Sequence, residues 1–160
     1  MQTKEELENW YSQSDRWGYF NEPDDSIRLK QIIVLLDSYD SCIDIGCGEG
    51  FVTRHLPCKN IYGLDISDNA TSRLPSNVSI LKEPNGKHDL VISTGTLYQQ
   101  YNHKQIYDWI IQSAKYHILI GGIKDWLIDY PFGVKLKEVE FKYRTYTQKL
   151  MLYKYDGTCT

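Results

Sequence analysis

The 160-residue sequence has no long hydrophobic run, few cysteines and prolines, and little excess charge of either sign. A membrane-spanning helix needs about 20 consecutive apolar residues, so neither a membrane span nor a secretory leader is expected. A formal net charge of -3 gives no overall attraction to nucleic acid or to an anionic membrane. We therefore expect a soluble, cytoplasmic protein that binds neither nucleic acid nor a membrane.

The four cysteines, Cys42, Cys47, Cys58 and Cys159, lack the spacing of a disulfide framework or a zinc site. Cys47, His55 and Cys58 could be drawn as metal ligands, but there is no C-x-x-C pair and Cys47 falls among glycines. The sequence therefore predicts free thiols and no metal.

What the sequence does contain is the run Cys42-Ile43-Asp44-Ile45-Gly46-Cys47-Gly48-Glu49-Gly50. The apolar residues before the first glycine predict a buried strand, and residues 51–56 predict a helix. Glycines at a strand end let main-chain N–H groups approach a ligand, because no Cβ stands between them and the ligand. The run therefore predicts a loop that binds a small ligand, and the alternative is a turn whose glycines serve only close packing.

The spacing of the glycines distinguishes between kinds of ligand. A dinucleotide site requires G-x-G-x-x-G, whose third glycine would stand at Phe51, whereas here it is Gly50. Asp44 lies two residues before the first glycine, where a carboxylate repels a pyrophosphate and attracts positive charge. The pattern predicts a cationic ligand and disfavours a nicotinamide or flavin dinucleotide.

A second acid ends the next predicted strand. Residues 61–65 read as a strand that finishes at Asp65, 21 residues after Asp44. At about this distance in a βαβ unit, a carboxylate on the neighbouring strand meets the hydroxyl groups of a ribose. The sequence therefore predicts that Asp65 binds a ribose.

Predicted strands and helices alternate along most of the chain. Strands are predicted at residues 42–45, 61–65, 78–81, 88–93 and 116–120, and helices at 3–11, 23–36, 51–56, 67–74 and 102–114. Such alternation gives a parallel sheet with helices on both faces. Residues 134–143 and 148–155, joined by residues 144–147, read as an antiparallel hairpin. The predicted fold is a Rossmann-like, doubly wound, mostly parallel α/β sheet that ends in this hairpin.

This organisation predicts one domain over residues 1–160. Its parts are N-terminal helices and an aromatic lid at 1–38, a ligand-binding core at 41–126, and the hairpin at 134–155.

The pattern D-x-G-x-G-x-G at residues 44–50 resembles the first motif of class I S-adenosylmethionine (SAM)-dependent methyltransferases, whose ligand is a sulfonium with an α-amino group. Residues 17–155 look like a small-molecule enzyme of this class. The segments Asp15-Arg16-Trp17-Gly18-Tyr19 and Thr96-Leu97-Tyr98 are similar to the NodS-like N-methyltransferases, and the chain also resembles compact methyltransferases carried by phages.

The resemblance implies a set of contacts to SAM. The implied residues are Asp44, Gly46, Cys47, Gly48 and Gly50 around the methionine end, Asp65 and Ile66 near the ribose, Ser93 and Thr94 past the fourth strand, and Trp17, Tyr19 and Arg28 from the N-terminal part. The loop with Trp17 and Tyr19 would fold over SAM, and Arg28 would reach its carboxylate.

Two features depart from the family pattern. Between the third and fourth strands, relatives carry a longer segment with an aspartate for the adenine amino group, whereas residues 83–87 offer only Glu83. No N/D-P-P-Y/F segment follows the fourth strand, and this disfavours methylation of DNA bases.

Methyl transfer needs few catalytic side chains, because the sulfonium already activates the carbon and positioning does most of the work. A base is needed only for an alcohol or an ammonium acceptor. Ligands bind at the carboxyl ends of parallel strands, so His88 and His117, which begin strands, face the wrong side. The expected acceptor contacts are Tyr98 first, then Tyr19, His103 and Asp125.

The sequence thus predicts a SAM-dependent methyltransferase that acts on an N or O atom of a small molecule and releases S-adenosylhomocysteine (SAH). One alternative is a non-catalytic SAM-binding regulatory or partner subunit, and another is an NAD-dependent reductase. The acceptor and the oligomeric state are left open.

Overall fold

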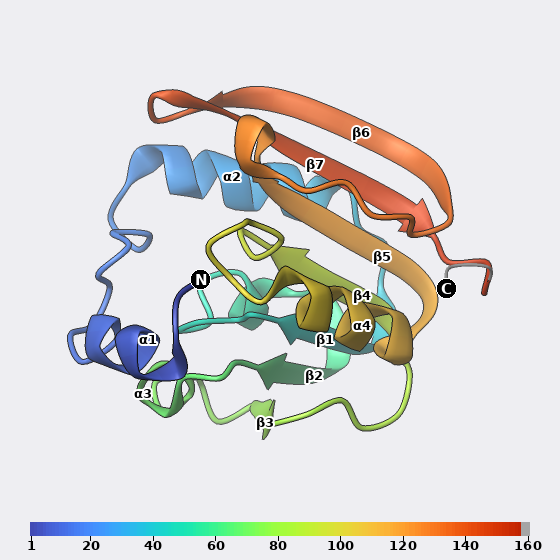
Figure 1. Cartoon of the computed structure of the whole chain (residues 1–160). Coiled ribbons are helices and arrows are strands. Elements are labelled where there is room, and N and C mark those ends of the chain that lie inside the picture. Colours follow the sequence, from blue (N-terminus) through green and yellow to red (C-terminus); the bar gives the residue numbers. More distant parts are fainter. Residues whose placement is uncertain (158–160) are drawn as a thin grey trace.

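The computed structural model describes residues 1–157, in which seven strands form one sheet in the order β3-β2-β1-β4-β5-β7-β6 (Figure 1). The strands are β1 (Tyr39–Ile45), β2 (Cys58–Leu64), β3 (Val78–Leu81), β4 (His88–Thr94), β5 (Ala114–Ile123), β6 (Val134–Tyr143) and β7 (Tyr146–Lys154). Strands β1 to β5 are parallel, and β7 runs antiparallel between β5 and β6. The predicted Rossmann-like sheet with a terminal hairpin is confirmed.

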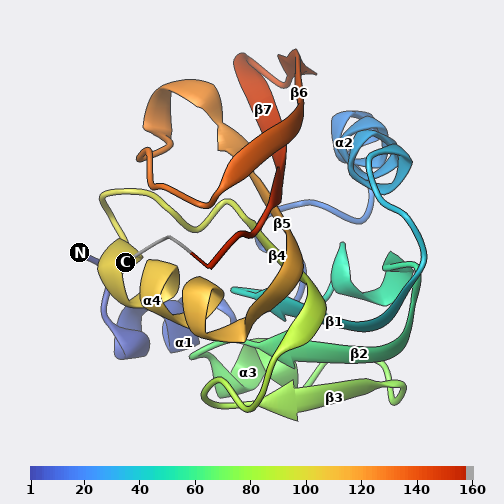
Figure 2. The ribbon, with the colours of Figure 1, turned by 90° about the vertical axis from the view of Figure 1, so that its right-hand side faces the viewer.

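Helices cover both faces of this sheet. They are α1 (Lys4–Trp10), α2 (Pro23–Val34), α3 (Asp68–Thr71) and α4 (His103–Ser113), with the 3-10 helices η1 (Thr53–His55) and η2 (Lys124–Trp126). Figure 2 shows α4 on one face and α2 on the other. Helix α1 begins with the predicted capping box, in which Thr3 and Glu6 bond each other's backbone N–H.

The two faces are buried by strict alternation of side chains along the central strands. On β1, Ile43 and Ile45 pack with Ile110 of α4, whereas Cys42 packs with Ile32 of α2. Since neighbouring side chains of a strand point to opposite faces, a strand covered on both sides needs apolar residues at every position. This explains why the buried end of β1, residues 42–45, is apolar except for Asp44.

No α-helix follows the glycine run, and the prediction for residues 51–56 is wrong. Only η1 forms there, and the chain enters β2 directly at Cys58. Six residues separate Gly50 from Pro57, and the residue before a proline favours an extended backbone, as Leu56 has with φ -63° and ψ 134°. The glycine turn therefore offers main-chain N–H groups without a helix dipole behind them.

Several element ends differ from the predicted ones. Helix α3 stops at Thr71 instead of Leu74, and β5 begins at Ala114, immediately after α4. The hairpin turn is two residues long, because β7 already begins at Tyr146. Arg144 in this turn has φ 53°, a left-handed conformation that side chains seldom adopt.

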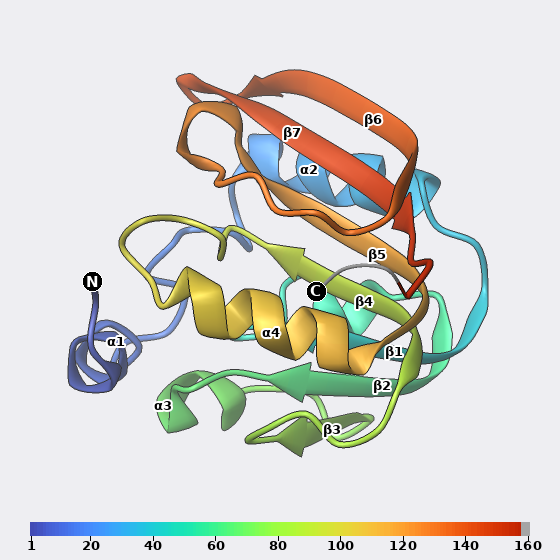
Figure 3. The ribbon, with the colours of Figure 1, turned by 45° about the vertical axis from the view of Figure 1, so that its right-hand side comes forward.

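The carboxyl ends of the parallel strands form one edge of the molecule, and α1, α3, the loop after β4 and the hairpin turn gather there (Figure 3). Cys42, Cys47 and Cys58 are free thiols, as predicted, and Cys159 lies outside the described residues. Over residues 1–157, no helix combines the length and apolarity needed to cross a bilayer.

Candidate functional site

A cavity of about 340 Å³ opens at the carboxyl ends of the parallel strands. Its floor comes from the ends of β1, β2 and β4, and its walls come from α1, the N-terminal lid at residues 15–20, α4 and the hairpin. Open α/β sheets bind their ligands at this edge, where the strand order reverses between β1 and β4.

The glycine turn closes tightly over the end of β1. The N–H of Gly46 donates to the carbonyl oxygen of Leu64 at 2.7 Å. Gly46 has φ +78°, and a Cβ there would lie 2.3 Å from Cγ2 of Thr96, so only glycine fits. Gly46, Cys47 and Gly48 line the cavity, whereas Gly50 does not. Gly50 instead makes room for Leu74, so for this glycine the close-packing alternative holds.

Asp44 lies in the floor of the cavity and is only 3% exposed. Its carboxylate accepts a hydrogen bond from Oγ1 of Thr53 at 2.7 Å. Burial raises the pKa of Asp44 to about 7; the Thr53 hydrogen bond opposes the shift, and the nearby Asp65 adds to it. A cationic group in the cavity would stabilise the charged form of this carboxylate.

Asp65 follows β2 and lines the same cavity. Its two carboxylate oxygens each accept one backbone hydrogen bond at 2.9 Å, from the N–H of Ser67 and the N–H of Gly48. Burial raises the pKa of Asp65, and these two hydrogen bonds oppose the shift. A carboxylate has about four lone-pair sites, so both oxygens keep the capacity to accept from a ligand.

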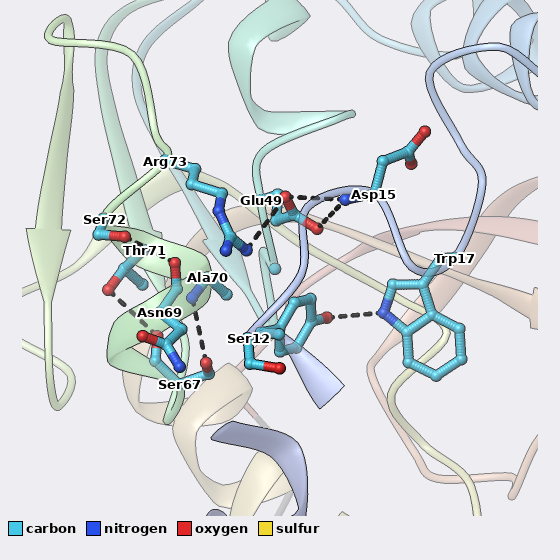
Figure 4. A network of polar contacts seen from close by, with 12 residues as sticks. Ser12, Asp15, Trp17, Glu49, Ser67, Asn69, Ala70, Thr71, Ser72 and Arg73 are labelled. Carbon is cyan, nitrogen blue, oxygen red and sulfur yellow. Dashed lines mark hydrogen bonds and ion pairs between the residues drawn. The ribbon is translucent and has the colours of Figure 1, made fainter. Parts of the chain in front are cut away.

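The N-terminal lid is fastened to the glycine turn by a network of polar contacts (Figure 4). The carboxylate of Glu49 accepts the backbone N–H of Asp15 at 2.9 Å and lies 3.4 Å from Nη1 of Arg73. The side chain of Asp15 in turn accepts the backbone N–H of Tyr19 at 2.7 Å. These contacts hold the predicted lid residues Trp17 and Tyr19 against the cavity, which both of them line.

Arg28 lines the cavity from α2 and is almost fully buried. Its Nε lies 3.2 Å from Oδ1 of Asp25, and its guanidinium lies 4.9 Å from the centre of the Tyr19 ring. The same Asp25 carboxylate also binds Nη2 of Arg144 and the hydroxyl of Tyr143, each at 2.7 Å. Two guanidinium groups thus share the Asp25 carboxylate, and the neighbouring Asp24 carboxylate accepts the backbone N–H of Arg144 at 2.6 Å.

An aromatic group of residues after β4 and β5 lines the cavity beside the hairpin, where Tyr146 pairs with Tyr143. The hydroxyl of Tyr98 accepts the N–H of Ile123 at 2.8 Å, and burial raises the pKa of Tyr98 to about 12. The ring of Trp126 meets Tyr98 edge-on at 5.7 Å and lies 5.1 Å from Tyr146. Trp126 and Tyr146 are 43% and 42% exposed, so they form the mouth of the cavity.

Three further predicted site residues do not line the cavity. Ser93 is fully buried beneath the turn, where its Oγ donates to the carbonyl oxygen of Ile45 at 2.7 Å. His103 directs Nδ1 to the hydroxyl of Tyr130 at 2.7 Å, and Asp125 is exposed on η2. The other predicted site residues, Ile66 and Thr94 among them, do line the cavity.

Sequence reasoning missed several residues that build the site: Tyr11, Asp25, Glu49, Thr53, Thr96, Tyr143, Arg144 and Gln148. Glu49 carried one available signal, as the only charged residue within the glycine turn. Within residues 1–157, no group of three or more His, Cys, Asp or Glu side chains is arranged to hold a metal ion.

Residues 43–115 match a family model described as a methyltransferase domain. A comparison with curated proteins finds no match. Among solved structures, N-methyltransferase NodS from Bradyrhizobium japonicum WM9, in complex with SAH, superposes with a TM-score of 0.77 over 95% of this chain and 97% of that chain, at 16% identity. Magnesium protoporphyrin IX methyltransferase ChlM from Synechocystis PCC 6803, with bound SAM, gives 0.73 over 98% of both chains at 12% identity. The predicted resemblance to class I methyltransferases is confirmed by the domain match and the fold.

Proposed function

We propose that this chain, which carries a methyltransferase domain of the class I fold, transfers a methyl group from SAM to an N or O atom of a small molecule. The observation that supports this most strongly is that Asp44, the glycine turn and Asp65 meet in one cavity. The cavity volume lies within the range of about 300–1,000 Å³ that is typical of small-molecule sites.

The charges of the cavity fit the two ends of the methionine part of SAM. Asp44 supplies a buried carboxylate beside the glycine turn for the α-amino group. Arg28, which lines the cavity from α2, supplies a guanidinium for the carboxylate. We assign the ribose hydroxyls to Asp65, whose oxygens retain free lone pairs.

Adenine would bind at the α4 side of the cavity. None of residues 83–87 lines the cavity, so Glu83 is not proposed as an adenine contact. The apolar side chains of Ile66, Ile106 and Trp109 do line it, and they can sandwich a purine ring. In this assignment, apolar stacking replaces the aspartate that relatives place after the third strand.

SAM, when bound, supplies a methyl carbon already activated by the sulfonium. This chain contributes position and exclusion of water, which are sufficient for an in-line displacement. The lid that carries Trp17 and Tyr19 covers the cavity, and the Glu49 network fixes that lid. We place the acceptor at the mouth formed by Trp126 and Tyr146. Tyr98, held there by Ile123, is assigned a positioning contact rather than the role of a base.

Calorimetry with SAM, SAH and NADH tests this proposal. We expect one molar equivalent of SAM or SAH to bind and NADH not to bind. Transfer of a labelled methyl group to small-molecule acceptors then separates the enzyme from the non-catalytic SAM-binding subunit. Binding of NADH without SAM would contradict the proposal and favour a reductase.

A further inference from the structure

Gln148 is a polar side chain in the cavity wall that the assigned contacts leave unused. It lies on β7, lines the cavity and is only 4% exposed. Within the described part of the chain, its Oε1 has no hydrogen-bond partner. A buried carbonyl oxygen without a partner is costly, and most such groups in folded proteins are paired. The side chain is therefore available to a ligand group.

The position of Gln148 in the sheet places it near Tyr98, beside the mouth where we place the acceptor. It pairs with Ile123 of β5, whose N–H is bound by the hydroxyl of Tyr98. In the order β1-β4-β5-β7, the strand of Gln148 is three strands from the strand of Asp44. At a strand spacing of about 4.8 Å, this corresponds to roughly 14 Å across the sheet. Gln148 thus lies well away from Asp44, beside Ile123 and Tyr98.

Across residues 1–157, no histidine lines the cavity, and its carboxylates are either assigned to SAM, as Asp44 and Asp65 are, or hold the lid, as Asp15 and Glu49 do. These carboxylates are Asp15, Asp44, Glu49 and Asp65, and each accepts at least one hydrogen bond from the protein. An alcohol must lose its proton as it attacks, and neither the Gln148 amide nor the Tyr98 hydroxyl can take that proton at neutral pH. A neutral amine attacks without a base.

We propose that the acceptor is a small molecule with a neutral primary or secondary amine, and that Oε1 of Gln148 accepts an N–H hydrogen bond from it. This inference rests on the proposed function. The hydrogen bond turns the nitrogen lone pair toward the methyl carbon. The N–C bond forms, the C–S bond breaks with its electron pair remaining on sulfur, and the resulting ammonium group releases one proton to solvent.

The amide must present its oxygen to the nucleophile for this geometry to work. The amide can rotate about its last side-chain bond, so either Oε1 or the NH2 group can face the cavity. An NH2 group would donate to the nitrogen lone pair and compete with the methyl carbon. The amine N–H therefore selects the orientation with Oε1 toward the ligand.

The body of the acceptor fits the aromatic mouth. The ring centroids of Trp126 and Tyr146 lie 5.1 Å apart, and both side chains are exposed beside the cavity. Exposed aromatic pairs of this kind bind apolar or aromatic groups through their faces. An arylamine, which is neutral at neutral pH, matches both the mouth and the Gln148 amide.

The test starts from the SAH complex, so that binding does not depend on turnover. Calorimetry first measures SAH, and then aniline and 2-naphthylamine, which are neutral amines at neutral pH, are titrated into the SAH complex beside benzyl alcohol and 2-naphthalenemethanol. A labelled-methyl assay with SAM repeats the same pairs. We expect the amines to be bound and methylated in preference to the alcohols by about tenfold or more.

Gln148→Met removes the acceptor oxygen at similar volume, and Gln112→Leu, at an exposed position on α4, is the matched control. In Gln148→Met we expect unchanged SAH affinity and about a tenfold loss of preference for amines. The exposed Trp126→Ala variant leaves the core intact and should weaken both members of each pair equally.

The outcomes distinguish failure of the proposed methyltransferase function from failure of the amine assignment. A protein that does not bind SAH contradicts the proposed function itself. SAH binding with equal use of amines and alcohols, with no use of any amine, or with an unchanged preference in Gln148→Met overturns the amine assignment alone.

Discussion

At the scale of single residues, the carboxylate of Asp65 is held ready for a ligand by two backbone N–H groups. We predict that Asp65→Ala weakens SAM binding by roughly 1–3 kcal/mol, because the ribose hydroxyls lose a charged acceptor. Calorimetry measures the effect. Asp108→Ala, at an exposed position on α4, should leave the affinity unchanged. An unaltered affinity in Asp65→Ala would remove this residue from the site.

Because the pKa of Asp44 is raised, we predict that the affinity for SAM depends on pH. Its pKa is raised to about 7 in the free protein, so below pH 7 the carboxyl group is mostly protonated and must release a proton to bind an ammonium group. SAM affinity should therefore rise with pH up to about 7 and then level off. Calorimetry in two buffers of different ionisation enthalpy would detect the released proton, and Asp44→Asn should abolish the release. Affinity independent of pH would contradict the assignment.

The raised pKa of Asp44 also makes the stability of the free protein depend on pH. Here the effect is opposite to that on SAM binding, because stability falls as the pH rises. The folded state holds the Asp44 proton more tightly than the unfolded state, whose aspartate pKa is about 3.9. This contribution to stability is therefore full at low pH and is lost as the pH rises toward 7.

Sequence reasoning found the site residues that local spacing determines. Asp44 and Asp65 stand at strand ends whose positions follow from the apolar pattern, and both line the cavity. Gln148 and Arg144 could not be found in this way, because Gln148 is placed by pairing with β5 and Arg144 by hydrogen bonds to the distant Asp25 and Trp17. His103 follows the correct strand, but its ring binds Tyr130, and no local pattern specifies that orientation.

At the scale of elements, the N-terminus of α2 is joined to the hairpin turn by Asp25. This fully buried carboxylate binds Arg28 on its own helix and Tyr143 and Arg144 across the cavity wall. We predict that Asp25→Ala destabilises the protein by about 3 kcal/mol or more, because it leaves the buried guanidinium of Arg28 unpaired.

Urea unfolding measures this effect, with Asp37→Ala at an exposed position after α2 as the control. The control should change stability by no more than about 0.5 kcal/mol. A loss of similar size in both variants would show that the Asp25 cluster does not join the two elements.

Elements with strong local signals were predicted well. The strand at Val78–Leu81 and the capped start of α4 at Asn102 follow from apolar patterning and cap chemistry. The helix expected after the glycine turn does not form, because Pro57 follows too soon for more than the single turn of η1. The segment before Pro57 is therefore too short for the α-helix that the pattern of strand, glycine turn and helix predicts.

At the scale of the whole molecule, the alternation of strands and helices predicted the parallel part of the sheet, and the two β-rich runs at the end predicted the hairpin. The insertion of β7 between β5 and β6 was not specified by sequence, since antiparallel pairing on either side gives the same alternating pattern. The sheet brings segments from both ends of the chain around one cavity.

A crystal structure of the protein with SAH tests the central claim most directly. We predict the amino group beside Asp44, the carboxylate at Arg28, the ribose hydroxyls on Asp65 and adenine between Ile66 and the α4 side chains Ile106 and Trp109. An empty cavity at saturating SAH, or SAH bound elsewhere on the molecule, would contradict the account.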